Sequence, residues 1–363
     1  METKRASWAS NLGFLMAAIG SAVGLGNIWG FPYKMGKSGG FAYLAVYALL
    51  AIFVGFIVMA SELAMGRKTG QGAMGTYHAL TKKFRWIGWL ALFSPFAVMG
   101  FYAVLGGYCI EYMALNLSNF AFGSESLATG GELFAAMLSN PAGAVLFAAL
   151  FLALCYLINR SGISGGIEKF NNVGMPTLFV MLVVIIIRSL TLPGAEAGVS
   201  FYLSPDPSKL EKTGLFPVIN AAMNQAFFTL SVGIGAMCIF GSYQGKDRSL
   251  TGEAMWIMGL DTFVALMAGL IIFPACFAFG VEPGSGPGLV FVTLPNIFNV
   301  MAGGQLWGTL FFIFMSFAAL STVIAVFENI ISYSADVWGM ERRRATWLHA
   351  VGIWVCSLPC ALG

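Results

Sequence analysis

Charge is the property that this 363-residue sequence has least of. Asp, Glu, Lys and Arg together make up 10% of its residues, whereas an average soluble domain carries about 25%. A soluble protein of this length needs charged residues on its surface, so the composition excludes a soluble protein. Histidine occurs only twice, at His78 and His349, and neither belongs to a metal-ligand cluster. No nucleophile–base pair or nucleotide loop stands out, so we expect neither an enzyme nor a nucleic-acid partner.

Cysteine is also scarce, and its placement excludes a disulfide framework. All six cysteines lie in apolar stretches, where a thiol behaves as a small hydrophobic side chain. They are Cys109, Cys155, Cys238, Cys276, Cys356 and Cys360. What the sequence has instead is apolar residues, which make up 58% of it, with a mean hydropathy of +0.81. This composition indicates an all-α polytopic membrane protein, with lipid as one of its partners.

Charged and polar residues mark the limits of long apolar runs, and a spanning helix needs about 20 such residues. We expect nine spans, in the ranges 6–33, 38–61, 86–116, 141–160, 171–188, 215–243, 253–280, 305–337 and 345–363. A basic loop joins the second and third spans. The segments 120–140, 191–214 and 283–304 are polar or rich in Gly and Pro, and we expect outer loops there, the last partly folded back.

The basic residues predict the orientation of these spans. With the N-terminus inside, fourteen of the 19 Lys and Arg residues fall on inner segments and five on outer ones. Cytoplasmic segments carry such an excess. We therefore expect the cell inner (plasma) membrane as the location, with the N-terminus in the cytoplasm.

The first span is interrupted in its middle. Gly20, Gly24, Gly26 and Asn27 lie where a spanning helix should be most regular, and each interior glycine weakens a helix by about 1 kcal/mol. Non-helical backbone at that depth is tolerated only where protein buries it or it lines a cavity. We interpret the stretch as a helix unwound at mid-membrane, with free peptide groups to hold a ligand. For Gly20 and Gly24 alone, close helix packing is the alternative.

A second interruption lies five spans later, around Ser231, Gly233 and Gly235. Corresponding glycine-interrupted spans in two halves point to the binding site of a secondary transporter. An odd offset of five spans means that the second half is inserted upside down. We therefore expect one transmembrane domain over 1–363, with a first repeat over 1–190 and a partial inverted repeat over 215–363.

These motifs resemble the neurotransmitter:sodium symporter family, in its bacterial amino-acid branch. The matching stretches are 20–32 with 37–40, 62–67, 165–176, 225–235, 293–295 and 317–325. The resemblance implies the leucine-transporter fold, with an inverted repeat of spans 1–5 and 6–10 and with spans 1 and 6 unwound at mid-membrane. It also implies sodium-coupled symport of an amino acid by alternating access.

The resemblance implies two sodium sites built from oxygen atoms, which suit a hard cation. Site 1 would use the Ala22 carbonyl, the side chains of Asn27, Thr229 and Asp261, and the substrate carboxylate. Site 2 would use the carbonyls of Gly20, Val23 and Ala318 and the hydroxyls of Ser321 and Thr322. Considered one at a time, each of these hydroxyls could equally well form a hydrogen bond with a backbone carbonyl of its own helix.

The substrate site that the resemblance implies joins a polar end to an apolar pocket. The carboxylate would meet the amides of Leu25 and Gly26 near Tyr102, and the ammonium the carbonyls of Ala22 and Phe228 and the Ser231 hydroxyl. Val98, Tyr102, Phe228, Ile234, Thr322 and Val326 would line the pocket, with Thr229 beside them. By the family resemblance, Gly24 occupies the position at which the monoamine carriers have an aspartate. Its missing side chain favours a substrate with its own carboxylate, a small hydrophobic or aromatic amino acid.

Asp261 is the only charge between Glu253 and Glu282. An acid at that depth costs about 2.5–3.5 kcal/mol on insertion scales, so it needs a cation or a proton. By the family resemblance, many relatives have asparagine at this position. Those relatives depend on chloride to supply the compensating negative charge. We therefore expect no chloride dependence, and proton antiport through Asp261 is an open possibility.

On the cytoplasmic side, Arg5 and Asp336, helped by Trp8 and Tyr243, resemble the family's inner gate. The arginines 342–344 are most simply read as topology and lipid-headgroup charge. The family usually has eleven or twelve spans, and this sequence stops in the ninth. The alternative to a symporter is therefore a truncated, non-transporting membrane protein or fragment that binds sodium and an amino acid.

Overall fold

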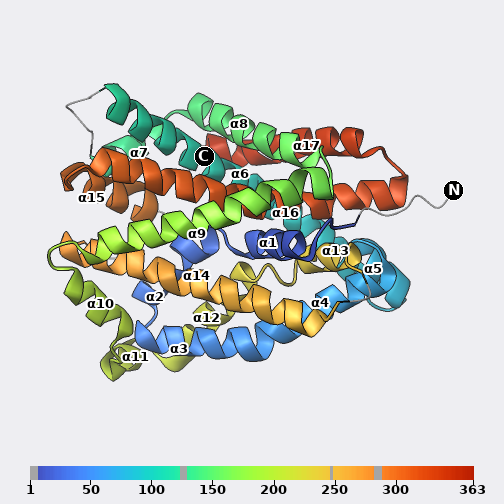
Figure 1. Ribbon diagram of the computed structural model, residues 1–363, viewed down its shortest axis with the longest axis horizontal. Helices are drawn as coiled ribbons and strands as arrows, with labels where there is room; N and C mark the ends of the chain where they lie inside the picture. The colour runs from blue at the N-terminus through green and yellow to red at the C-terminus, as the bar shows by residue number, and fades with distance from the viewer. Residues whose placement is uncertain (1–6, 123–128, 246–247, 282–287) are drawn as a thin grey trace.

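The computed structural model describes residues 7–122, 129–245, 248–281 and 288–363, and within these ranges the chain is helical without strands (Figure 1). In the described part of the chain, seven helical segments are long and apolar enough to cross a membrane. They are Phe41–Thr69 (α3, η2 and α4), Arg85–Phe122 (α6), Pro141–Asn159 (α8), Ile163–Leu190 (η3 and α9), Leu250–Ala278 (α14), Gly304–Trp338 (α16) and Arg342–Leu362 (α17). Each overlaps a span expected from the sequence.

The two remaining spans are the interrupted ones. The first consists of α1 (Asn11–Ala22), η1 (Gly26–Gly30) and α2 (Phe31–Lys37), with a bend of 46° at the break. The other consists of α12 (Leu215–Thr229) and α13 (Ala236–Ser242), separated by a turn over 230–235. The predicted fold class is therefore confirmed, with both interruptions where the glycines predicted them.

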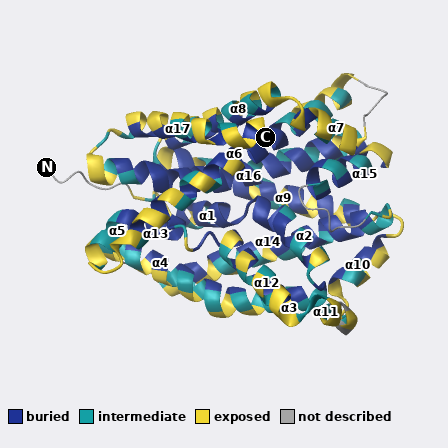
Figure 2. Cartoon of the chain, turned by 180° about the vertical axis from the view of Figure 1, so that it is seen from behind, coloured by how far each residue is buried: buried dark blue, intermediate teal, exposed yellow. Residues whose placement is uncertain are grey.

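The long helix α16 forms the centre of the molecule. In its most apolar stretch 83% of residues are buried, whereas the corresponding figure for Phe41–Thr69 is 22%. Figure 2 shows the same contrast, with buried residues along α16 and α1 and exposed residues along the outer helices α8, α17, α3 and α4. A polytopic membrane protein packs small residues where helices must approach closely. Gly66 is such a point, because a Cβ atom there would overlap the carbonyl of Cys238 on α13.

Several segments expected to be loops contain short helices. They are α5 (Ala73–Leu80), α7 (Gly130–Leu138), α10 (Ala195–Leu203), α11 (Pro207–Thr213), η4 (Leu289–Thr293) and α15 (Leu294–Val300). Polar and Gly/Pro-rich composition marks a segment as lying outside the membrane without excluding a helix. Some of these helices have caps readable in the sequence, such as the capping box of Thr129 and Glu132 on α7.

The fifth span begins earlier than predicted, at Ile163 rather than Asn171. The charged residues Glu168 and Lys169 lie just before that predicted start. Glu168 is only 3% exposed, and its carboxylate accepts hydrogen bonds from the backbone N–H groups of Ala9 and Ser10 at 2.8 and 3.1 Å. This acid therefore binds the start of α1 inside the protein and does not mark the membrane boundary.

Candidate functional site at the two helix breaks

The break in the first span has a local cause in Asn27. The N–H of Gly24 donates to Oδ1 of Asn27 at 3.1 Å, so this amide is diverted from the carbonyl of Gly20, its ordinary helical acceptor four residues earlier. The helix ends at Ala22 and restarts as a wide turn at Gly26. The carbonyl of Gly24 still accepts the N–H groups of Asn27 and Ile28, whereas the carbonyls of Gly20, Ser21 and Val23 accept side-chain hydroxyls from other spans.

The break in the sixth span depends on backbone conformations that favour glycine. Gly233 and Gly235 have φ angles of 87° and 80°, which a residue without a Cβ atom adopts at no steric cost. Ser231, with φ 51°, is the one non-glycine residue of positive φ among those described, a conformation that costs about 1–2 kcal/mol. The buried carboxylate of Glu62 accepts the N–H of Gly233 at 2.6 Å and stabilises the turn.

The two breaks are joined directly. The hydroxyl of Ser231 donates to the carbonyl of Ser21 at 3.0 Å, and Nε2 of Gln225 donates to the carbonyl of Gly26 at 2.7 Å. Side chains of the sixth span thus donate hydrogen bonds to backbone carbonyls of the first span, about two hundred positions away in the sequence.

A cavity lies beside this junction, and the structure brings nearly all of the predicted substrate-binding residues to it. Its lining residues are Ala22, Gly26, Val98, Tyr102, Phe227, Phe228, Thr229, Ser231, Ile234, Thr322 and Val326. Phe227 was not expected from the sequence. Leu25 was expected but is absent from the lining, although its N–H donates to the Tyr102 hydroxyl at 3.0 Å. A Cβ atom at Gly24 would overlap the Thr322 hydroxyl and lie 2.9 Å from that of Tyr102.

The first predicted ion site forms a buried cluster around Asp261, which is 0% exposed. Nδ2 of Asn27 donates to Oδ1 of Asp261 at 2.6 Å, and the Thr229 hydroxyl lies close to the same carboxylate and 3.2 Å from that of Tyr47. Oδ2 of Asp261 has no hydrogen-bond partner within the described ranges. An acid buried with an unpartnered oxygen needs a cation or a proton, so the residues fit a bound sodium ion.

The second predicted ion site brings α1 against α16. The Thr322 hydroxyl lies 3.4 Å from the carbonyl of Gly20 and 3.2 Å from that of Val23. The Ser321 hydroxyl lies 3.4 Å from the carbonyl of Val23 and 3.0 Å from that of Ala318. Oxygens that share a hard cation at about 2.3–2.6 Å are separated by about 3–4 Å. The spacing and the all-oxygen donor set therefore fit sodium.

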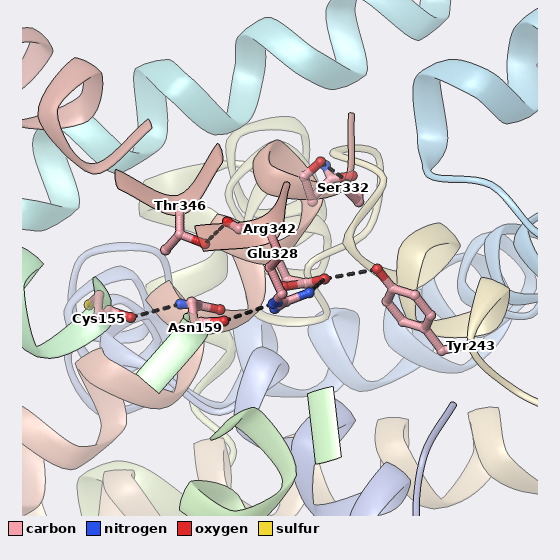
Figure 3. A network of polar contacts seen from close by, with 8 residues as sticks. Cys155, Asn159, Tyr243, Glu328, Ser332, Arg342 and Thr346 are labelled. Carbon is pink, nitrogen blue, oxygen red and sulfur yellow. Dashed lines mark hydrogen bonds and ion pairs between the residues drawn. The ribbon is translucent and has the colours of Figure 1, made fainter. Parts of the chain in front are cut away.

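An ion-pair network lies next to Tyr243 of the predicted inner gate, and the sequence did not identify its partners (Figure 3). Tyr243 donates its hydroxyl to Oε1 of Glu328 at 2.8 Å. Arg342 binds the same carboxylate with two nitrogens, at 3.0 and 2.5 Å, and donates Nε to the carbonyl of Asn159 at 3.0 Å. The Glu328 side chain is 0% exposed, so its charge is compensated inside the protein.

The interpretation of all three arginines as headgroup charge is wrong for Arg342. Its side chain is 28% exposed and paired with Glu328, whereas Arg344 is 83% exposed and lies 3.9 Å from Glu341. The signal that could have revealed the pair was Glu328 itself, an acid in the middle of a predicted span, which requires an internal partner. Nothing in the sequence indicated which arginine that partner would be.

The predicted inner gate is described in part. Trp8 lies edge-on to Tyr243, with ring centroids 6.3 Å apart, and donates Nε1 to the carbonyl of Phe240 at 3.4 Å. Asp336 accepts the N–H of Gly72 at 3.1 Å. Arg5 lies outside the described residues. Trp8 and Tyr243 are therefore brought together, and Tyr243 connects them to the network of Glu328 and Arg342.

A helical membrane protein whose two interrupted spans meet beside a mostly apolar cavity with a few polar groups has the architecture of a secondary transporter. The model of the sodium:neurotransmitter symporter family matches residues 5–124 and 138–362. The chain belongs to this family, which consists of transporters and not of enzymes, as predicted.

Individual relatives agree with this family. The sodium-dependent transporter YhdH of Bacillus subtilis (strain 168) is 36% identical over 99% of this chain and 79% of its own length. The sodium-dependent transporter MJ1319 of Methanocaldococcus jannaschii is 31% identical over 94% of this chain and 72% of its own. A crystal structure of MhsT in complex with L-phenylalanine has a TM-score of 0.90 and 39% identity, covering 99% of this chain and 81% of that one.

Proposed function

We propose that this chain carries a small hydrophobic or aromatic amino acid into the cell together with sodium, by alternating access. Sodium-coupled transport follows from the family. The observation that carries the finer proposal is the junction of the two breaks through Ser231 and Ser21, because it places free peptide groups of both spans beside one cavity.

The polar end of the cavity suits a zwitterion. The amides of Leu25 and Gly26 begin the outer half of the first span, and the positive end of a helix dipole favours an anion. They would bind the substrate carboxylate together with the Tyr102 hydroxyl. The carbonyls of Ala22 and Phe228 end helical segments and favour a cation, so they would bind the ammonium group with the Ser231 hydroxyl.

The rest of the cavity selects an apolar side chain. Val98, Ile234 and Val326 present only hydrocarbon to it. Any side chain at Gly24 would take the space between Thr322 and Tyr102, so its absence leaves room for the carboxylate of an α-amino acid. That MhsT has been crystallised with L-phenylalanine supports an aromatic or large aliphatic substrate here.

We further propose two sodium sites and no dependence on chloride. One ion would lie at Asp261 with Asn27, Thr229, the carbonyl of Ala22 and the substrate carboxylate. The other would lie between α1 and α16. The negative charge of Asp261 makes a chloride ion unnecessary beside the first site.

Alternating access needs a closed cytoplasmic side while the outer side is open. We propose that Trp8 and Tyr243, with Arg5 and Asp336, form this closure, and that Glu328 and Arg342 hold Tyr243 in place. We place the N-terminus in the cytoplasm and the chain in the inner membrane, as the distribution of its basic residues indicates. Residues 1–190 and 215–363 would be the first repeat and part of its inverted counterpart.

The substrate class is tested by equilibrium binding of labelled L-phenylalanine to the purified protein, with the other amino acids as competitors. We expect binding in sodium chloride and none in potassium chloride, displaced by leucine, tyrosine and tryptophan but not by glutamate, lysine or glycine. Displacement by charged amino acids, or binding that does not require sodium, contradicts the proposal.

A further inference from the structure

One buried side-chain oxygen next to the second ion site has no partner. Asn171, on α9, is 0% exposed, and its Nδ2 donates to the carbonyl of Ile167 at 2.9 Å. Its Oδ1 has no hydrogen-bond partner within the described residues. Because a carbonyl can only accept, the amide atom that faces Ile167 must be the nitrogen, and the atom on the other side must be the oxygen. A buried acceptor without a donor is unfavourable and rare in native structures.

This oxygen faces the place where α1 and α16 meet. A Cβ atom added at Gly20 would overlap Oδ1 of Asn171 and would lie 3.0 Å from its Cγ and 3.2 Å from Cβ of Ser321. Asn171, Gly20 and Ser321 therefore converge on one point, and the last two belong to the second predicted sodium site. Gly20 is required there for a specific reason, since any side chain would push the amide of Asn171 away.

We propose that Asn171 supplies a further oxygen to sodium at the second site, so that α9 joins α1 and α16 in binding the ion. The inference rests on the proposed function, which places sodium at Gly20, Val23, Ala318, Ser321 and Thr322. Among the described residues no hydrogen-bond donor reaches Oδ1, which lies against Gly20. With a cation nearby, the unpartnered amide oxygen gains a charge to bind, and the hydrogen bond to Ile167 holds it in position.

The neighbouring residue provides a matched control. Asn172 is the same residue type on the same helix, about 100° further around its axis, and it is exposed. We would compare the wild type with Asn171→Leu, which keeps the shape and removes the oxygen, Asn171→Asp, which keeps an oxygen and adds charge, and Asn172→Leu. The readout is the thermal unfolding midpoint of the purified protein in sodium chloride titrated against choline chloride, without amino acid. Omitting the amino acid weights the second site, because site 1 needs the substrate carboxylate.

We expect Asn171→Leu to raise the sodium concentration for half-maximal stabilisation by about tenfold, Asn171→Asp to lower it, and Asn172→Leu to leave it unchanged. An unchanged sodium midpoint for Asn171→Leu overturns the inference, as does a shift in melting temperature that is equal in sodium and in choline. If Asn171→Leu does not fold, an unchanged midpoint for Asn171→Asp overturns it. Absence of both sodium stabilisation and sodium-dependent amino-acid binding in the wild type would instead overturn the proposed function.

Discussion

The hydroxyl of Ser231 lies 3.0 Å from the carbonyl oxygen of Ser21 and donates a hydrogen bond to it. This bond joins the break of the first span to that of the sixth. Ser231 can reach Ser21 because its backbone adopts a left-handed conformation, which the flanking turn and the carboxylate of Glu62 maintain. The two interruptions are thus parts of one binding site and depend on each other for their shape.

Removing that hydroxyl should weaken amino-acid binding. Ser231→Ala loses the bond to Ser21 and one proposed partner of the ammonium group. A single hydrogen bond contributes about 0.5–1.5 kcal/mol, so we expect the dissociation constant for phenylalanine to rise by about 2- to 10-fold. Ser61→Ala is the control, since the Ser61 hydroxyl is exposed and bonds only to its own helix. Equal affinities for the two variants would contradict the role of Ser231.

A carboxylate at position 24 should abolish amino-acid binding. In Gly24→Asp the new side chain would meet the hydroxyls of Thr322 and Tyr102 and would place a negative charge where the substrate carboxylate is expected. We predict a loss of phenylalanine binding of at least about tenfold, since like charges in one site repel strongly. Gly165→Asp, at an exposed position near the start of the Ile163–Leu190 segment with nothing within 4 Å, should bind normally. Retained binding in Gly24→Asp would show that the carboxylate lies elsewhere.

Chloride replacement tests the proposed role of Asp261. Uptake by the wild type should be unchanged when gluconate replaces chloride, because the fixed carboxylate already supplies the negative charge next to the first sodium ion. Asp261→Asn should transport poorly in gluconate and regain part of its activity when chloride is added. A large loss of wild-type uptake in gluconate would reject this account of Asp261.

The buried ion pair should be costly to break from one side. Arg342→Ala leaves the fully buried Glu328 without its cation, and removal of one partner of a buried pair costs about 3–5 kcal/mol. The double variant Glu328→Gln with Arg342→Gln should recover much of this loss, because no charge is then left unpaired. The measurement is a double-mutant cycle, in which the thermal unfolding of the wild type, the single variants and the double variant is compared in detergent. Arg343→Ala, at an exposed position, is the control, and equal melting temperatures for Arg342→Ala and Arg343→Ala would contradict the prediction.

The sequence predicted the helix breaks because their cause is local. Gly24, Asn27, Gly233 and Gly235 act on the backbone within a few residues, and such effects can be read from spacing. Most residues of the cavity were then predicted from the family resemblance. The match to the family model confirms the family itself.

Contacts between distant segments could not be predicted in the same way. The fifth span was predicted to begin only at Asn171, because the sequence does not show that the backbone N–H groups of Ala9 and Ser10 bind Glu168. Arg342 was read as a surface charge for the same reason. In both cases burial and a specific partner determine what the charge does, and both depend on how helices pack.

Sodium-driven accumulation tests the central claim most directly. The purified protein in proteoliposomes should accumulate labelled L-phenylalanine under an inward sodium gradient, and Gly24→Asp should not. With potassium in place of sodium, accumulation should disappear. Uptake that is the same in sodium and potassium, or sodium-dependent binding without any accumulation, would contradict a sodium-coupled symporter built on the two interrupted spans.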